Sequence, residues 1–191
     1  MTDAAPRPTP TDATSASARD ALRASDSVLA ALIDRVEPVD LTAWRRRWAL
    51  DPFRALARSV VGQQIAGRAA EAIFGRLQAF IGDRAPAAAI ADATDAELRA
   101  VGLSAAKAAS LRDLAGRTLD GRLQLDRIDQ LSDDDARLQL IAVRGIGAWT
   151  ADIFLLAQLG RPDVLPAGDL GIHRAVQMRS EERRVGKECR L

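Results

Sequence analysis

The sequence is poor in cysteine, histidine and aromatic residues. Its 191 residues include one Cys, one His, three Trp, four Phe and no Tyr. One cysteine excludes an internal disulfide and any zinc or iron–sulfur site with several cysteine ligands. No apolar run reaches the roughly 20 residues needed to span a bilayer, and the N-terminus lacks the basic-then-apolar pattern of a secretory signal. We therefore expect a cytoplasmic protein without a membrane partner.

An excess of charge of one sign is also absent. The 27 Lys and Arg residues nearly balance the 26 Asp and Glu residues, so the formal net charge is +1. Proteins that coat nucleic acid are usually far more basic. If this protein binds DNA, it should do so locally, through a few contacts.

Alanine and leucine are abundant, and the apolar residues recur with the period of a helix. The composition, 48% hydrophobic, favours an all-helical protein, and no long stretch alternates with the period of two that strands require. Helical patterns are predicted at 22–36, 52–80, 94–100, 105–119, 133–143, 149–159 and 170–178. Gly62 and Gly67 should break the second of these into two helices, and Thr94 with Glu97 forms a capping-box pattern. The predicted fold class is all-α.

The two ends of the chain differ from this pattern. Residues 1–20 are rich in Pro, Thr, Ser and Ala and are interpreted as a disordered leader. Residues 179–191 are charged, lack an apolar face and resemble a translated sequencing-adapter read, so we interpret them as a non-native tail. The alternative is an ordinary solvated C-terminal tail. The domain at 21–178 is then expected to be incomplete at its C-terminus.

Two glycines flank one isoleucine between two predicted helices, at Gly145-Ile146-Gly147. Glycine can adopt the positive φ that a tight helix–turn–helix requires. Such a turn also presents backbone N–H groups at the start of the second helix, where a DNA phosphate can bind without a charged side chain. Ile146 would pack into the core. The alternative is an ordinary helix cap followed by a short loop.

Asp169 lies in the sequence Pro-Ala-Gly-Asp-Leu-Gly, at the expected start of the helix at 170–178. From the local sequence alone it is best explained as an N-cap, a role worth about 1 kcal/mol.

Three segments together resemble the helix-hairpin-helix DNA glycosylase superfamily, in its 3-methyladenine DNA glycosylase II branch. They are FRALARSVVGQQIAGRAAEAI, LRAVGLSAAKAASLRDLA and VRGIGAWTADIFLLAQLGRPDVLPAGDLG. They match that family's early helix pair, its middle turn, and its hairpin with the downstream aspartate, and the resemblance covers Leu22 to Met178. It implies a two-lobed helical bundle in which double-stranded DNA and a flipped base meet at a cleft between the lobes.

The resemblance assigns catalysis to Asp169. Cleavage of an N-glycosidic bond builds positive charge on the sugar, which a carboxylate stabilises. The damaged base must first leave the stack. Bifunctional relatives carry a lysine two residues after the second hairpin glycine, and this chain has Trp149 there. Because no Schiff base can form at a tryptophan, the expected enzyme is a hydrolytic N-glycosylase without AP lyase activity.

The base pocket is assigned to Trp149, whose ring could attract a cationic base by about 0.5–2 kcal/mol; core packing is the alternative. Phe53 and Trp44 could join it, although Phe53 is expected in the core. Gln64 matches the side chain that fills the space of the flipped base, while a solvent-facing turn is the alternative for both glutamines. The expected DNA-binding residues are Gln63, Gln64, Gly145, Ile146, Gly147 and Thr150.

Family hairpins also bind a monovalent cation, Na⁺ or K⁺, through backbone carbonyls. The matching positions are Ile141, Val143 and Ile146. No other cofactor is implied.

The expected protein is a monomer that repairs alkylated bases such as 3-methyladenine and associates with the nucleoid when it acts. The alternatives are a non-catalytic helix-hairpin-helix DNA-binding module and a purely structural helical protein. Exposed apolar surface is expected near Leu156, Leu159 and Ile172.

Overall fold

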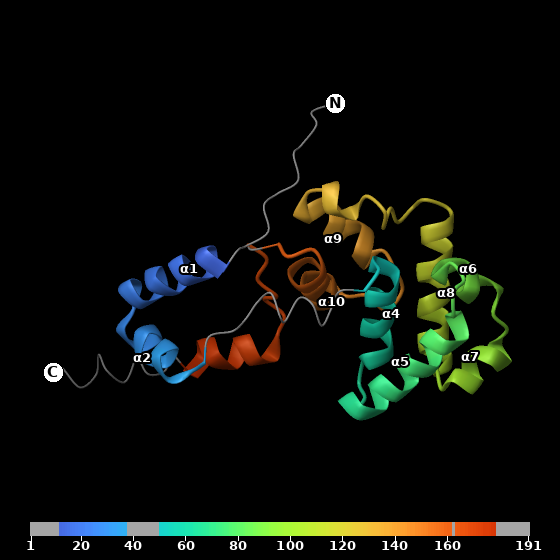
Figure 1. Ribbon diagram of the computed structural model, residues 1–191, viewed down its shortest axis with the longest axis horizontal. Coiled ribbons are helices and arrows are strands. Elements are labelled where there is room, and N and C mark those ends of the chain that lie inside the picture. The colour runs from blue at the N-terminus through green and yellow to red at the C-terminus, as the bar shows by residue number, and fades with distance from the viewer. Residues whose placement is uncertain (1–11, 38–49, 162, 179–191) are drawn as a thin grey trace.

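The computed structural model describes residues 12–37, 50–161 and 163–178, and all regular secondary structure within these ranges is helical (Figure 1). The all-α prediction is therefore confirmed. Trp44 and the tail at 179–191 lie outside the described residues. No helix in the described part of the chain combines the length and the apolar character needed to cross a membrane.

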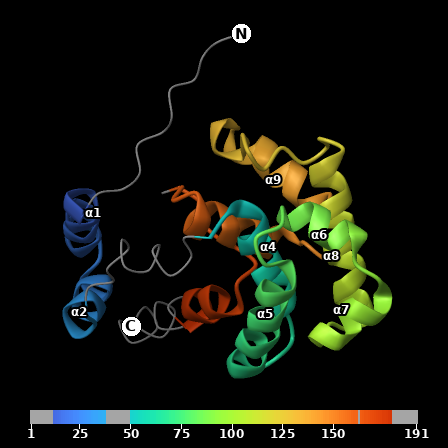
Figure 2. The ribbon, with the colours of Figure 1, turned by 45° about the vertical axis from the view of Figure 1, so that its right-hand side comes forward.

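The N-terminal region forms two helices where one was expected. Helices α1 (Asp12–Ser25) and α2 (Ser27–Arg35) pack against each other. They are separated at Asp26, whose carboxylate accepts the N–H groups of Val28 and Leu29 and caps α2. The expected single helix at 22–36 was wrong. Helix α1 also overlaps the expected disordered leader at 1–20, of which residues 1–11 lie outside the described part. In Figure 2 this pair lies away from the other labelled helices.

Five consecutive helices follow, and most of them begin or end where the sequence indicates. They are α4 (Pro52–Gly62), α5 (Gly67–Ile81), α6 (Pro86–Asp92), α7 (Asp95–Val101) and α8 (Ala105–Leu119). The break between α4 and α5 and the bounds of α8 agree with the prediction. The capping box is present, because Thr94 and Glu97 each bond the backbone N–H of the other. Helix α6 was not predicted.

The remaining helices form the predicted hairpin and its continuation. Helix α9 (Asp133–Ile141), capped by Ser132, is followed by the turn at 142–147 and by α10 (Ala148–Ile153). A π-helical segment, Phe154–Gln158, continues α10, and a further helix covers 170–178. A short 3₁₀ turn at Ile128–Gln130 precedes α9.

One hydrophobic core unites α4 to α9 with α10 and its continuation. Its fully buried members include Leu56, Leu77, Leu111, Leu140 and Leu155. In Figure 1, α4 to α8 form one group and the helix at 170–178 lies on the opposite side of α10, which agrees with the expected two-lobed arrangement. In that view α10 lies between the two groups and α9 lies above it.

Exposed apolar side chains gather on the last segment, but not at the predicted residues. Leu156, Leu159 and Ile172 are half-buried. The exposed residues are instead Leu165, Leu170, Val176 and Met178. The expectation of exposed apolar surface is thus correct for the region and wrong for the residues.

Candidate functional site

The hairpin has one glycine that its geometry requires. Gly145 has φ +79°, and a Cβ there would lie 2.5 Å from Ser110 Oγ in α8. Gly147 has φ −92° and open space around its Cα. The positive φ expected in this turn is therefore found at Gly145 and not at Gly147. Ile146 is 4% exposed, so its predicted packing into the core is confirmed.

Side chains from two other elements fix this hairpin. The Asp113 carboxylate in α8 accepts the N–H of Arg144 at 2.7 Å and the Nε–H of Arg117 at 2.9 Å. Burial opposes ionisation of Asp113, but these hydrogen bonds outweigh it and lower the pKa of the carboxyl. From the other side, Gln63 Nε2 donates to the Gly145 carbonyl at 2.8 Å. Of these residues, the sequence indicated only Gln63 and Gly145.

The turn between α4 and α5 carries a strained residue. Gln64 has φ +57°, and it is the only non-glycine residue with positive φ in the described ranges. Such a conformation costs of order 1–3 kcal/mol, and residues held in it cluster at functional sites. The Gln64 side chain is exposed, as a wedge requires. The preceding end of α4 is held by Lys107, whose Nζ donates to the Val61 carbonyl at 2.6 Å.

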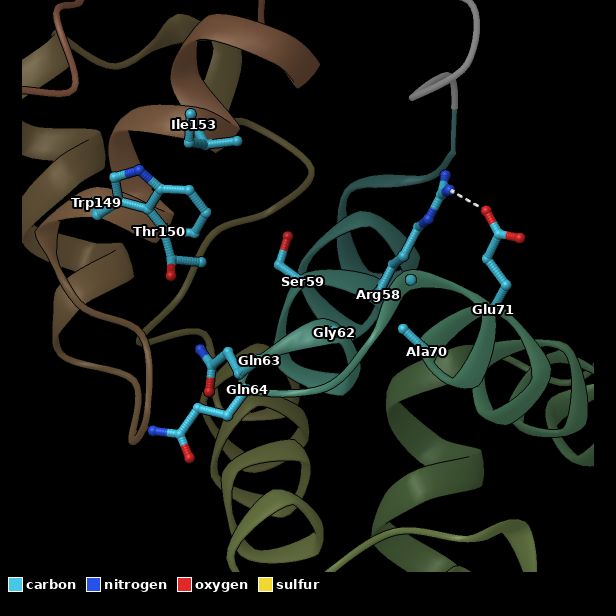
Figure 3. A pocket seen from close by; sticks show the side chains of 11 residues that line it. Arg58, Ser59, Gly62, Gln63, Gln64, Ala70, Glu71, Trp149, Thr150 and Ile153 are labelled. Carbon is cyan, nitrogen blue, oxygen red and sulfur yellow. Dashed lines mark ion pairs between the residues drawn. The ribbon is translucent and has the colours of Figure 1, made fainter. Parts of the chain in front are cut away.

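A cleft of about 480 Å³ separates this turn from α10. Gln63 and Gln64 line it on one side, and Trp149, Thr150 and Ile153 line it on the other (Figure 3). The structure thus brings together the predicted wedge, the predicted pocket wall and Thr150, which is buried. Phe53 is 4% exposed and belongs to the core, as expected.

Trp149 connects this cleft to Asp169. The indole is 45% exposed, which excludes the core-packing alternative, and its Nε1–H donates to Asp169 Oδ2 at 2.9 Å. Asp169 Oδ1 accepts the N–H groups of Gly171 at 2.8 Å and Ile172 at 3.1 Å, so Asp169 also caps the helix at 170–178. A single side chain therefore performs the cap role and presents a carboxylate beside the tryptophan.

These hydrogen bonds keep Asp169 ionised. The Trp149 indole, followed by the backbone amides of Ile172 and Gly171, lowers the pKa of Asp169 below its usual range. A carboxylate offers about four lone-pair positions. Three are occupied by these donors, so one position on Oδ2 stays available for a substrate or a water. The arrangement suits an anion that stabilises a neighbouring positive charge.

The backbone carbonyls predicted to hold a cation lie around the same hairpin. Ile141 ends α9, and Val143 and Ile146 belong to the turn, where the Val143 carbonyl also accepts the Ile146 N–H at 3.1 Å. Among the described residues no group of three His, Cys, Asp or Glu side chains is arranged to hold a metal ion.

An all-helical chain with this hairpin, cleft and aspartate is a helix-hairpin-helix protein. The family model described as HhH-GPD superfamily base excision DNA repair protein matches residues 57–184. The chain belongs to this family.

Several similar proteins carry related names. The chain is 35% identical over 125 residues to DNA-3-methyladenine glycosylase 1 of Schizosaccharomyces pombe, covering 64% of this chain and 55% of the relative. It is 35% identical over 133 residues to DNA-3-methyladenine glycosylase of Saccharomyces cerevisiae, covering 65% and 45%. The chain thus spans about half the length of these curated relatives.

Solved structures support the fold. An S. pombe 3-methyladenine DNA glycosylase in complex with abasic DNA superimposes with a TM-score of 0.68 at 30% identity, covering 82% of this chain and 76% of that one. A DNA-3-methyladenine glycosidase from Bacillus halodurans gives a TM-score of 0.61 at 34% identity, covering 65% and 58%. The helical arrangement is therefore that of helix-hairpin-helix glycosylases.

Proposed function

We propose that this chain carries the active-site region of a DNA repair glycosylase that hydrolyses the N-glycosidic bond of alkylated bases such as 3-methyladenine in double-stranded DNA. One observation carries the proposal above all others. An ionised Asp169 is fixed by the Trp149 indole and two backbone amides, and that indole lines the cleft. The names of the related proteins agree with this activity.

In the proposed reaction, the bond between the sugar carbon and the base nitrogen breaks and its electron pair leaves with the base. An alkylated base is already cationic, so it leaves as a neutral molecule without a strong general acid. The negative charge of the Asp169 carboxylate stabilises the positive charge that develops on the sugar. The free position on Oδ2 orients the attacking water, whose oxygen bonds to the sugar carbon and whose proton goes to the carboxylate or to solvent.

The DNA would be held by the hairpin and opened by the neighbouring turn. The α10 N-terminus has no side-chain cap, so its first N–H groups can meet a phosphate. Gln64 would fill the space of the displaced base, which would enter the cleft against the half-exposed face of Trp149. The proposed partner is double-stranded DNA, and the proposed state is a monomer.

The same geometry favours hydrolysis without strand cleavage. The position that would hold an amine nucleophile is occupied by Trp149, and an indole nitrogen cannot form a Schiff base with the sugar. The product would be an intact strand with an abasic site.

We also propose a monovalent cation at the carbonyls of Ile141, Val143 and Ile146. Oxygen ligands suit hard cations. The Ile141 carbonyl lies in the last turn of α9, where carbonyls lack helical partners. The Val143 carbonyl has a second lone pair beside the one used by Ile146. Such an ion would neutralise carbonyl charge beside the phosphate, and the reaction itself would require no cofactor.

The test is an excision assay on duplex DNA that contains 3-methyladenine, analysed before and after alkaline treatment. We expect free base in both samples and strand breaks only after alkali. Strand breaks without alkali would contradict the proposed monofunctional reaction. DNA binding without any base release would instead support a non-catalytic DNA-binding module.

A further inference from the structure

Two side chains tie the Gln64 turn to neighbouring elements. Gln63, the residue before Gln64, donates its Nε2–H to the Gly145 carbonyl of the hairpin at 2.8 Å. Lys107 donates its Nζ–H to the Val61 carbonyl, in the last turn of α4, at 2.6 Å. Gln63 and Gln64 leave the same turn and face the hairpin side of the cleft (Figure 3).

One face of α8 serves both the turn and the hairpin. Lys107, Ser110 and Asp113 are three residues apart in sequence and so share a helix face. Lys107 bonds the end of α4, Ser110 Oγ leaves no space for a Cβ on Gly145, and Asp113 bonds the Arg144 N–H. A rigid helix therefore sets the distance between the two elements that would touch DNA.

The donors of both tying side chains bond backbone carbonyls of the protein. The Gln63 amide is directed at a protein carbonyl, and Lys107 is half-buried, with its amine on the Val61 carbonyl. Burial lowers the pKa of Lys107, which agrees with an amine withdrawn from solvent. Both groups are thus engaged by protein carbonyls, although a basic residue close to a DNA-binding hairpin is usually interpreted as a phosphate contact.

We propose that Gln63 and Lys107 are positioning residues that couple the hairpin's hold on phosphate to base displacement by Gln64. This inference rests on the proposed DNA-binding function and replaces a direct DNA contact for Gln63. Without these ties the hairpin would still bind a duplex, but the turn would no longer be held at the depth where its side chain replaces a base.

The test is a double-mutant cycle with Gln63→Met and Lys107→Met in the full 191-residue chain. Binding is measured to an undamaged duplex and to a duplex with an abasic-site analogue, and the unstacking of an adjacent 2-aminopurine is followed by fluorescence. Each single variant should lower the preference for the abasic duplex about fivefold, the effect of one hydrogen bond. Affinity for undamaged DNA should change less than about twofold. The double variant should show the same preference for the abasic duplex as the single variant with the lower preference, because both side chains hold one turn.

A direct DNA contact by Gln63 predicts a different pattern. Gln63→Met would then weaken both duplexes equally, and Lys107→Met would act independently of it; either result overturns the proposal. Lys107→Arg keeps a cationic donor and should restore the preference, which a purely structural defect would not. Gln124→Met, at an exposed glutamine that does not line the cleft, is the matched control and should have no effect.

The cycle needs no bond cleavage, so it can fail independently of the proposed reaction. A wild-type chain that releases no base overturns the proposed reaction, and the coupling still stands when each single variant lowers the preference for the abasic duplex. A wild-type chain that unstacks 2-aminopurine no better than the two single variants overturns the coupling.

Discussion

The hairpin and the segment that carries Asp169 are held in contrasting ways. The hairpin is fixed by a buried isoleucine, by Asp113 of α8 and by Gln63 of the α4–α5 turn. The segment at 163–178 buries Val164 and Pro166 and then exposes most of its side chains, with Leu170 72% exposed. Its link to the cleft is the hydrogen bond between Trp149 and Asp169.

The region that would bind DNA and the region that carries the proposed catalytic carboxylate are therefore stabilised by different contacts. The surface that would hold DNA is part of the main hydrophobic core, so it keeps its shape as long as the domain is folded. The carboxylate depends on its own helix cap and on one indole. Substitutions in the two regions should therefore fail in different ways, and four experiments test that contrast.

Asp169→Asn should have the largest effect. Asparagine keeps the shape and is also a good N-cap, but it removes the negative charge that would stabilise the sugar cation. Base release should fall about 100-fold or more, measured under single-turnover conditions, while DNA affinity stays within about twofold. Retention of more than a tenth of the wild-type rate would show that catalysis depends on another group.

Gly145→Ala should damage the hairpin through its backbone. The residue has φ +79°, and the added Cβ would meet Ser110 Oγ at 2.5 Å. The left-handed conformation alone costs about 1–2 kcal/mol, so the total loss of stability should be about 2 kcal/mol or more in urea unfolding. Gly147→Ala is the matched control, because its φ of −92° and open surroundings accept a methyl group within about 0.5 kcal/mol. Equal losses at the two positions would refute the strained-turn explanation.

Trp149→Phe should shift the pH dependence of base release. Phenylalanine keeps an aromatic wall but cannot donate the hydrogen bond that, more than any other contact, lowers the pKa of Asp169. Losing it raises that pKa, so the acid limb of the rate–pH profile moves to higher pH. The stability of the fold depends on this pKa in the same direction. Because the pKa of Asp169 is lower in the folded than in the unfolded state, the carboxylate stabilises the fold at pH values above its unfolded pKa, and this contribution is lost as the pH falls through its folded pKa. An acid limb that stays in place would mean that the indole does not tune the carboxylate.

Leu170→Ala should have the smallest effect. The side chain is 72% exposed, so its removal should change the free energy of unfolding by less than about 0.5 kcal/mol. Leu140→Ala makes the same chemical change at a fully buried position and should cost about 2–5 kcal/mol. A large loss of stability on replacing Leu170 would show that this face is covered in solution, which would reduce the contrast between the two regions.

Local signals in the sequence predicted local structure well. The Thr94 capping box and the bounds of α8 depend on neighbouring residues and agree with the structure. Asp26 is the exception, because the apolar spacing on both sides of it favoured a continuous helix although its side chain caps a new one. The alanine-rich α6 offered too little contrast between polar and apolar residues for its helical period to be visible.

The sequence named several residues that the structure places around the cleft, but it did not indicate how they are connected. The resemblance singled out Asp169 and Trp149, but the hydrogen bond between them joins residues 20 apart in sequence. The bond from Gln63 to the hairpin spans 82 residues, and the bond from Asp113 to Arg144 spans 31. Such contacts depend on how helices pack in three dimensions, and no local period or motif carries that information.

The backbone of Gln64 has a consequence for directed evolution of this protein. An L-residue at φ +57° destabilises the native state, and glycine would relieve that strain at once. A screen for thermal tolerance alone should therefore enrich Gln64→Gly, a change that also deletes the side chain proposed to displace the base. Heat-resistant isolates with this change should thus survive selection, and under the proposed function they would open DNA less well.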